Sequence, residues 1–186
     1  MKRLIPSLII VGAMLASVTP ALAQRKALSP HETISATVDG DKVTIAYGRP
    51  YTRKGNTGEP RKIWGALVPW GKVWRTGADQ ATILTTEKPL VFGDLTVPPG
   101  KYSLFTLPVE EGTSKLIINK KTGQWGIGPG SHDESQDLGQ VDLKKTALDQ
   151  PVEQFTMAIE TNPSGGGVIK MMWEKTQFSV PFTVKP

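Results

Sequence analysis

The stretch ISATVDGDKVTIAY, residues 34–47, decides the fold class of this chain. Apolar residues alternate with polar ones on both sides of Asp39-Gly40. Alternation with a period of two is typical of a strand with one buried face, and Asp and Gly tolerate the positive φ angles of a tight turn. The stretch therefore predicts a β-hairpin.

Similar strand and turn patterns continue along the rest of the chain. Gly93-Asp94 separates two short apolar runs, which predicts a second tight hairpin, and Pro98-Pro99-Gly100 is typical of a turn. Pro181 cannot donate a hydrogen bond to a neighbouring strand, so we expect a sheet edge, or pairing on one side, at that position. The expected strands cover residues 34–38, 43–47, 82–86, 91–92, 95–97, 101–107, 115–119, 155–159, 168–174 and 177–184.

Helical patterns are weak in this chain. No segment longer than about a dozen residues keeps an apolar repeat of 3.6, and one short helix or helical turn is expected over residues 62–67. The sequence contains 19 Gly and 15 Pro, which suit many turns between short strands. We therefore predict an all-β, single-domain antiparallel β-sandwich or jelly-roll-like fold with at most one short helix.

The first 23 residues have the pattern of a cleavable signal peptide. Two basic residues precede a mostly apolar run over residues 4–18, and Ala21-Leu22-Ala23 matches the small-x-small cleavage site. The apolar run is too short for a membrane span of about 20 residues. We expect cleavage after Ala23 and a periplasmic or secreted protein; the alternative is an uncleaved N-terminal anchor.

The remaining chain, residues 24–186, is long enough for one domain with a full core, and residues 24–30 are expected to form a loose tail. Its basic residues exceed its acidic residues by three and form no clustered stripe, so we do not expect nucleic acid as a partner. The absence of Cys excludes disulfides, thiol nucleophiles and Cys-ligated metals. We expect no membrane span after cleavage, and no cofactor.

Six sequence strings resemble a single protein family. They are AYGRP (46–50), IWGALVPWGKVWRTGADQAT (63–82), VPPGKYSLFTLP (97–108), LIINKKTGQWG (116–126), DESQDLGQV (133–141) and WEKTQFSVPF (173–182). Together they are similar to the exported bacterial family catalogued as domain of unknown function 2911, from Ser29-Pro30 to Phe182. The resemblance implies an exported single domain, and it implies no catalytic residues because the family is itself uncharacterised.

One segment departs from the pattern of that family. Its members usually connect the Arg-Pro turn to the Ile-Trp/Phe-Gly motif through a short Arg-Gly-Arg-like link, whereas KGNTGEP, residues 54–60, lengthens the link here. We expect the loop of residues 53–61 to be exposed. If it borders a site, the ligand preference of this chain should differ from that of the family.

The stretch WGALVPWGKVWRTGADQAT, residues 64–82, is the richest candidate for a binding site. Arg75 and Asp79 lie four positions apart in it, so they could clamp a polar ligand, with the guanidinium donating and the carboxylate accepting hydrogen bonds. The alternative is a buried Arg–Asp pair that fixes a corner of the fold. Arg49, which precedes Pro50, has the same two interpretations.

Trp64, Trp74 and Trp125 offer flat apolar faces. On a β-sandwich such faces can stack on sugar rings, although the more common role of Trp is to fill the core. The predicted ligand-binding residues are Arg49, Trp64, Trp74, Arg75, Asp79 and Trp125.

The motifs indicate no catalytic or metal site. Asp133-x-Ser135-x-Asp137, beside His132, suggests a calcium loop, but its glycine comes one place late and Lys144 stands where Glu is needed. A polar surface loop is the better interpretation. Signatures of serine hydrolases, zinc proteases and phosphate-binding loops are absent from the sequence, so we assign no catalytic residue and no metal ligand.

Three functions fit this sequence. The first is an exported protein that binds a polar envelope ligand such as a glycan; the second is a structural or protein-interaction module of the cell envelope; the third is a hydrolase without a recognisable motif. A pocket that unites Arg49, Arg75 and Asp79 would favour the first or third. The same residues buried and mutually paired would favour the second, and two carboxylates facing across a cleft would favour the third.

Overall fold

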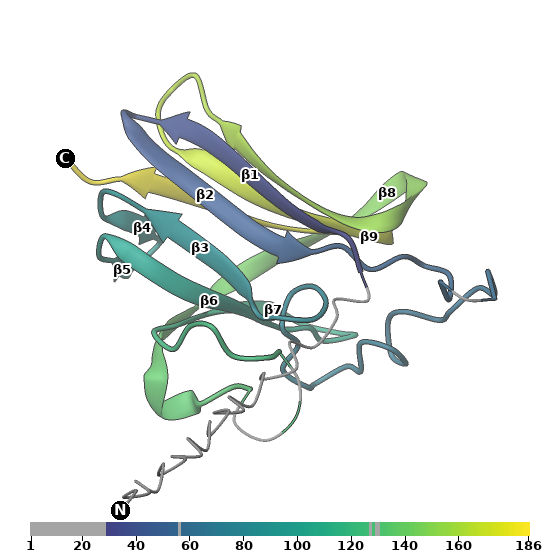
Figure 1. The fold of residues 1–186 in the computed structure, drawn as a ribbon. Coiled ribbons are helices and arrows are strands. Elements are labelled where there is room, and N and C mark those ends of the chain that lie inside the picture. Colours follow the sequence, from purple (N-terminus) through teal and green to yellow (C-terminus); the bar gives the residue numbers. More distant parts are fainter. Residues whose placement is uncertain (1–28, 56, 127, 129–130) are drawn as a thin grey trace, which may run out of the picture.

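The computed structural model describes residues 29–55, 57–126, 128 and 131–186 (Figure 1). The predicted signal peptide, and residues 24–28 of the predicted tail, lie outside the described residues. In the described part no helix is long and apolar enough to span a membrane. The elements are β1 (His31–Val38), β2 (Asp41–Gly48), β3 (Thr82–Thr86), β4 (Leu90–Phe92), β5 (Leu95–Val97), β6 (Gly100–Leu107), β7 (Ser114–Asn119), the 3-10 helix η1 (Glu134–Gln136), β8 (Asp137–Thr161) and β9 (Gly167–Val184).

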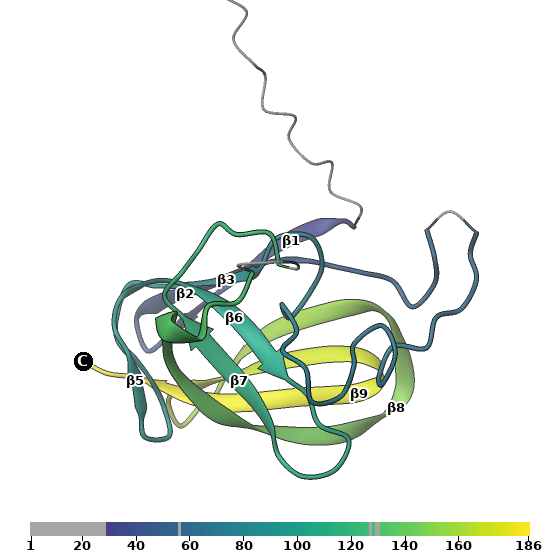
Figure 2. The ribbon, with the colours of Figure 1, turned by 90° about the horizontal axis from the view of Figure 1, so that it is seen from below.

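All neighbouring strands pair antiparallel in one sheet with the order β1-β2-β3-β6-β7-β8-β9-β4-β5. This arrangement confirms the predicted all-β antiparallel class. The long strand β8 joins two halves of the sheet, because it pairs with β7 as far as Leu143 and with β9 from Lys144 onward. β1 and β2 consequently lie across from β8 and β9 (Figures 1 and 2), and β1 contacts β8.

The main core fills the space between these halves of the sheet. Its largest fully buried side chain is Trp173, and apolar residues from both halves surround it. A smaller cluster of Ala81, Phe105 and Ile117 is separate from this core. The ring of His132, from the loop before η1, covers Phe105 with the ring centroids 4.9 Å apart.

The hairpin around Asp39-Gly40 forms as the sequence predicts. Asp39 and Gly40 have φ angles of 47° and 76°, which tight two-residue hairpins require. The carboxylate of Asp39 also accepts a hydrogen bond from the Gly166 amide at 2.6 Å. The turn thereby ties β1 and β2 to the connection between β8 and β9.

Of two local predictions, the short helix or helical turn at residues 62–67 is a set of turns, and the division of the last two strands needs correction. Residues 62–67 form tight turns, including a bond from the Ala66 amide to the Ile63 carbonyl, and the 3-10 helix lies at η1 instead. The two strands expected at residues 168–174 and 177–184 are one strand, β9, which contains Glu174 at a φ of 49°. Pro181 lies between the part of β9 that pairs with β8 and the part that pairs with β4, as expected for a residue without an amide hydrogen.

Tyr47 gives the fold a predicted dependence on alkaline pH. Its hydroxyl donates to Glu32 at 2.7 Å and accepts from the Met157 amide at 3.0 Å, so it links β1, β2 and β8. Burial raises the pKa of Tyr47 to about 12 from 10.0; the Met157 bond lowers it and Glu32 raises it. The folded state therefore keeps a proton that the unfolded chain releases, and the free energy of unfolding should fall as the pH rises from about 10 to about 12.

Urea unfolding at several pH values between about 9 and 12 checks this expectation. Tyr47→Phe should have a shallower decline over this range, since it has no phenol to titrate. Equal declines in both proteins would show that Tyr47 does not cause the pH dependence.

Candidate functional site

The segment Trp74 to Asp79 forms a packed corner of the fold. Thr76 is fully buried although its φ is 56°, and its hydroxyl shares a hydrogen bond of 2.7 Å with that of Thr106 on β6. Thr82 donates to the Thr76 carbonyl at 2.7 Å. These bonds hold a backbone conformation that a residue with a Cβ atom rarely adopts.

Trp64 and Trp74 belong to an aromatic cluster that continues into the core. The Trp74 ring stacks on Trp173 with centroids 6.0 Å apart, and its indole N–H donates to the Gly77 carbonyl at 3.1 Å. Trp64 stacks on Trp70 at 5.6 Å and meets Trp74 edge-on at 5.9 Å. The described contacts thus engage much of both rings in packing.

Arg49 connects the end of β2 to β8. Its guanidinium donates to the Phe155 carbonyl at 3.2 Å and to the Thr156 hydroxyl at 2.9 Å, and it pairs with Glu32 at 3.3 Å. These contacts use all three nitrogens of the guanidinium. Arg49 therefore acts as a cross-strand tie.

Arg75 and Asp79 lie together at the corner. The Nε of Arg75 donates to the Gly77 carbonyl at 3.3 Å, and burial lowers the pKa of Arg75 while the charge of Asp79 raises it. Asp79 is 4% exposed; its carboxylate accepts from the Ser29 amide at 3.2 Å and lies 3.1 Å from His31 Nε2. The corner thereby fastens the chain just before β1.

The six predicted ligand residues occupy neighbouring but different places. Arg49 lies against β8, whereas Trp125 is half-buried beside the corner, where its backbone pairs with that of Gln80. None of the six lines the cavity described below. Their role as ligand contacts stays a prediction.

Arg75→Ala should destabilise the protein by about 2 kcal/mol, because it removes a half-buried hydrogen-bonding cation and the packing of its side-chain stem. The matched control is Lys72→Ala, an exposed charge in the same segment, which should change stability by less than about 0.5 kcal/mol. Urea unfolding measures both. If Arg75→Ala were as stable as the control, a ligand role for Arg75 would become the better interpretation.

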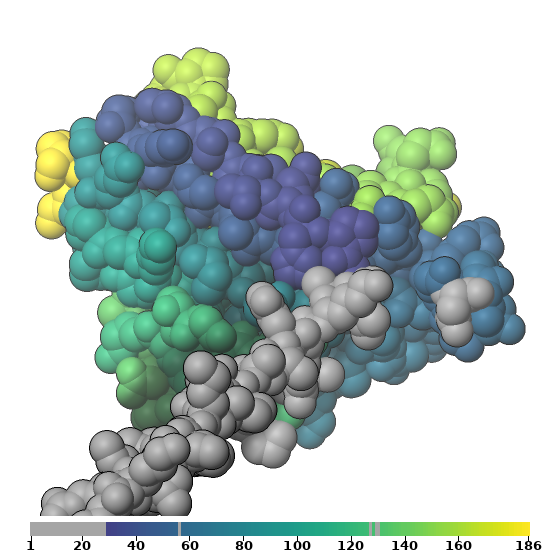
Figure 3. All heavy atoms as spheres, viewed as in Figure 1, coloured from purple at the N-terminus to yellow at the C-terminus, as the bar shows by residue number. Residues whose placement is uncertain are grey.

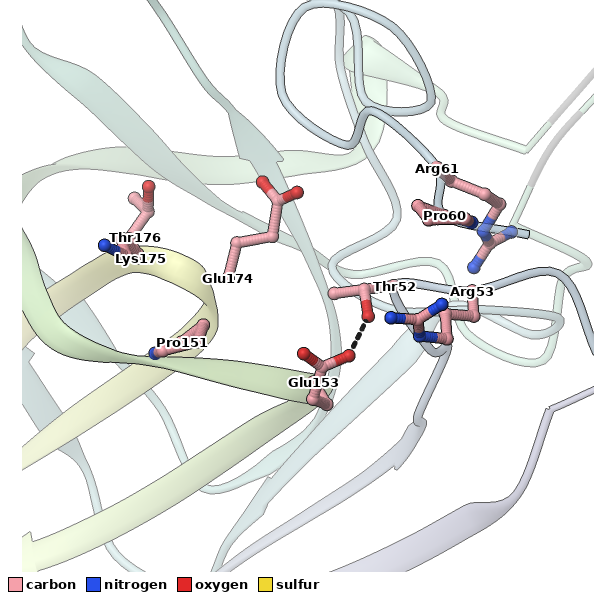
Figure 4. A pocket seen from close by; sticks show the side chains of 9 residues that line it. All are labelled: Thr52, Arg53, Pro60, Arg61, Pro151, Glu153, Glu174, Lys175 and Thr176. Carbon is pink, nitrogen blue, oxygen red and sulfur yellow. Dashed lines mark hydrogen bonds between the residues drawn. The ribbon is translucent and has the colours of Figure 1, made fainter. Parts of the chain in front are cut away.

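A cavity of about 430 Å³ lies between the loop that follows β2 and the paired strands β8 and β9 (Figure 4). An antiparallel bridge between Arg53 and Pro60 folds this loop back on itself beside the cavity. The register of β8 against β9 shifts on both sides of Val152, which pairs with Glu174. The lining residues are Thr52, Arg53, Pro60, Arg61, Pro151, Glu153, Glu174, Lys175 and Thr176.

Two glutamates line the strand side of this cavity. Burial raises the pKa of Glu174; a hydrogen bond from the Ile63 amide lowers it, and the charge of Glu153 raises it. Glu153 is exposed and accepts a hydrogen bond from the Thr52 hydroxyl. The two carboxyl groups therefore differ in environment. In enzymes, such a difference allows one carboxyl group to act as a general acid and the other as a base.

Two arginines line the loop side. Arg61 donates from Nη2 to the Tyr51 carbonyl, and its buried Nε has no hydrogen-bond partner among the described residues. Burial lowers the pKa of Arg61. Arg53 is exposed and donates from Nη1 to the Gly58 carbonyl at 3.1 Å. The cavity thus has two cationic donors from the loop, and two carboxylate acceptors and a third cation, Lys175, from the paired strands.

A second cavity, of about 620 Å³, lies between the β4–β5 hairpin and strands β8 and β9. Its lining includes Asp94 and Asp142 but no basic side chain, and Asp142 pairs with Lys115 outside it. The first cavity is therefore the better candidate for binding a polar ligand.

The His132 loop does not form a metal site in the described part of the chain. No group of three or more His, Asp or Glu side chains is placed there to hold an ion. His132 lies 2.9 Å from Asp137, which also accepts from Asn119 at 2.6 Å. This network fixes the loop over Phe105.

Sequence reasoning did not identify the residues of the first cavity. The charged loop of residues 53–61 could have indicated the position of the cavity, because it contains the segment that departs from the family pattern. Both arginines of this loop line the cavity. Glu153 and Glu174 had no such signal, since each is a single acid in a strand. The pairing of β8 with β9 brings them together.

A model of the family described as "Protein of unknown function (DUF2911)" matches residues 29–182. Comparison with curated proteins gave no match, and comparison with solved structures gave none. Any assignment of function must therefore come from the site itself.

Proposed function

The chain belongs to the DUF2911 family, whose description assigns no function, and we propose a function from the first cavity. We propose that the chain is an exported protein that binds a small polar ligand, such as a glycan of the cell envelope. The observation that carries the proposal is the cavity lined by charged groups of both signs. Arg53 and Arg61 supply donors, whereas Glu153 and Glu174 supply acceptors. A molecule rich in hydroxyl groups can use both kinds of group at once.

The size and position of the cavity support this proposal. Its volume of about 430 Å³ is within the range of about 300–1,000 Å³ that is common for small-molecule sites. The charged ends of its arginines and glutamates are not consumed by ion pairs among the described residues. Each of the four side chains makes one hydrogen bond within the protein, so its remaining donor or acceptor atoms are the ones that a ligand can use.

Export is supported by the sequence of the first 23 residues. The basic start, the short apolar run and the Ala-Leu-Ala cleavage pattern agree with a signal peptide. A chain without Cys also has no thiol that an oxidising compartment outside the cytoplasm could oxidise. A protein in that compartment meets envelope glycans and soluble sugars.

A hydrolase is the second candidate, because two carboxyl groups in different environments line one cavity. Glu174, whose pKa burial raises, would act as the acid and the exposed Glu153 as the base or nucleophile. Release of product from a bound glycan, lost in Glu174→Gln while binding remains, would support this candidate. Binding without turnover would favour the first proposal.

A thermal-shift screen of the protein from Gln24 onward tests the proposal, using oligosaccharides, envelope fragments, divalent metals and small anions. A ligand of the native state raises the unfolding midpoint by mass action. The expected result is a rise with an oligosaccharide that disappears in Glu153→Gln. Glu59→Gln is the control, because Glu59 pairs with Lys54 and does not line the cavity. No rise with any glycan would contradict the proposal and favour the interaction module.

A further inference from the structure

We propose that Arg53 and Arg61 form a carboxylate-binding site, so that the ligand of this pocket is an acidic saccharide that contains a uronic-acid unit. The inference rests on the proposed function, because it names the chemical class of ligand for the same cavity.

The loop holds the two arginines next to each other. Arg53 pairs with Pro60 in an antiparallel bridge, and the Arg61 amide donates to the Thr52 carbonyl at 2.8 Å. Figure 4 shows both guanidinium groups on one side of the cavity, away from Glu174. Two adjacent cations repel each other, and a shared anion removes that repulsion.

The guanidinium of Arg61 is incompletely hydrogen-bonded by the described residues. Its Nε is buried and has no hydrogen-bond partner among the described residues, while Nη2 is bound to the Tyr51 carbonyl. Neither Arg53 nor Arg61 takes part in an ion pair within the described part of the chain. Burial disfavours the charged form of Arg61 and lowers its pKa. A bound anion would offset this cost.

The rest of the lining limits which anion fits. It carries two carboxylates, Glu153 and Glu174, and one further cation, Lys175. Because the carboxylates outnumber this cation, they would repel a multiply charged group such as a phosphate dianion more strongly than a single carboxylate, and they accept hydrogen bonds from hydroxyl groups. A carboxylate carries one charge, and its planar shape matches the donor fork of a guanidinium. A uronic acid combines that carboxylate with several hydroxyl groups in one ring.

Calorimetry on the protein purified from cells that express the full chain tests the inference. The probes are an aldobiouronic acid, which is a disaccharide with one uronic-acid unit, and its methyl ester, which has nearly the same shape without the charge. We expect the acid to bind at least about tenfold more tightly than the ester. This preference should weaken as salt rises.

Charge-removing variants locate the effect. Arg61→Gln and Arg53→Gln should each lower the preference for the acid by about tenfold, and Lys54→Gln, a basic residue of the same loop that pairs with Glu59, should keep it. Arg53 is exposed, so Arg53→Gln should fold even if Arg61→Gln does not. A melting curve of each variant verifies folding.

The possible failures are distinguishable. Equal binding of acid and ester would overturn the carboxylate site and leave the proposed function standing. Binding of inorganic phosphate as tight as that of the acid would show a general anion site and overturn the saccharide assignment. If neither disaccharide nor any neutral oligosaccharide binds, the proposed function fails and the inference fails with it.

Discussion

Replacing Gly48 with alanine should abolish folding or lower the free energy of unfolding by more than about 4 kcal/mol. A Cβ atom at this position would lie 2.2 Å from the Ala78 carbonyl oxygen and 2.9 Å from the carbonyl carbon. Both are backbone atoms of the packed corner, so no side-chain rotation relieves the clash. The end of β2 and the corner would have to separate, and the hydrogen bonds of the corner would break with them.

Urea unfolding and the yield of soluble protein measure this effect, and Gly55→Ala is the matched control. An added Cβ at Gly55 would meet no atom within 4 Å, in a loop exposed to solvent. This control should be neutral or slightly more stable, because alanine restricts the unfolded chain. If both variants were equally stable, the close approach of β2 to the corner would be wrong.

Trp173→Ala should destabilise the protein by about 3–5 kcal/mol. The side chain is 1% exposed and is the largest that is fully buried. Its ring contacts those of Trp64, Trp74 and Phe155, with centroids 6.3, 6.0 and 5.8 Å away. Alanine would leave a cavity that three large rings cannot fill by small movements, and urea unfolding measures the loss.

Trp173→Phe separates packing from polarity at this site. The indole N–H of Trp173 is buried and has no partner among the described residues, and phenylalanine removes this unsatisfied donor while it keeps an aromatic ring. We expect a loss of about 1 kcal/mol or less. If Trp173→Phe lowered the free energy of unfolding as much as Trp173→Ala does, the expectation that the indole N–H contributes no stabilising hydrogen bond would be wrong.

The fold could be predicted where its signals are local. The alternation around Asp39-Gly40 predicts β1 and β2, and the β-branched run at residues 82–86 predicts β3, because each pattern is set by neighbours in the sequence. The first part of β8 was missed because its apolar positions, among them Val141 and Leu143, are sparse among exposed charges. Its pairing with β7 is set by tertiary contacts.

The site could be predicted less well than the fold. The sequence presents the corner around Arg75 as either a site or a structural element, and the half-buried hydrogen bond from Arg75 to the Gly77 carbonyl favours the structural role. Glu153 and Glu174 lie 21 positions apart and meet only through the pairing of β8 with β9, next to a loop more than 90 positions away from both. Such a combination leaves no short-range pattern for sequence reasoning to find.

The pairing of β4 with β9 has a consequence for the order of folding. Leu90 pairs with Val184, 94 positions later, so the β4–β5 hairpin has no neighbour in the sheet until the last strand has been made. Closing so long a loop is slow relative to forming a local hairpin. During synthesis the β1–β2 hairpin can form early, but the second half of the sheet must wait. The sheet can therefore close only after Val184 has left the ribosome.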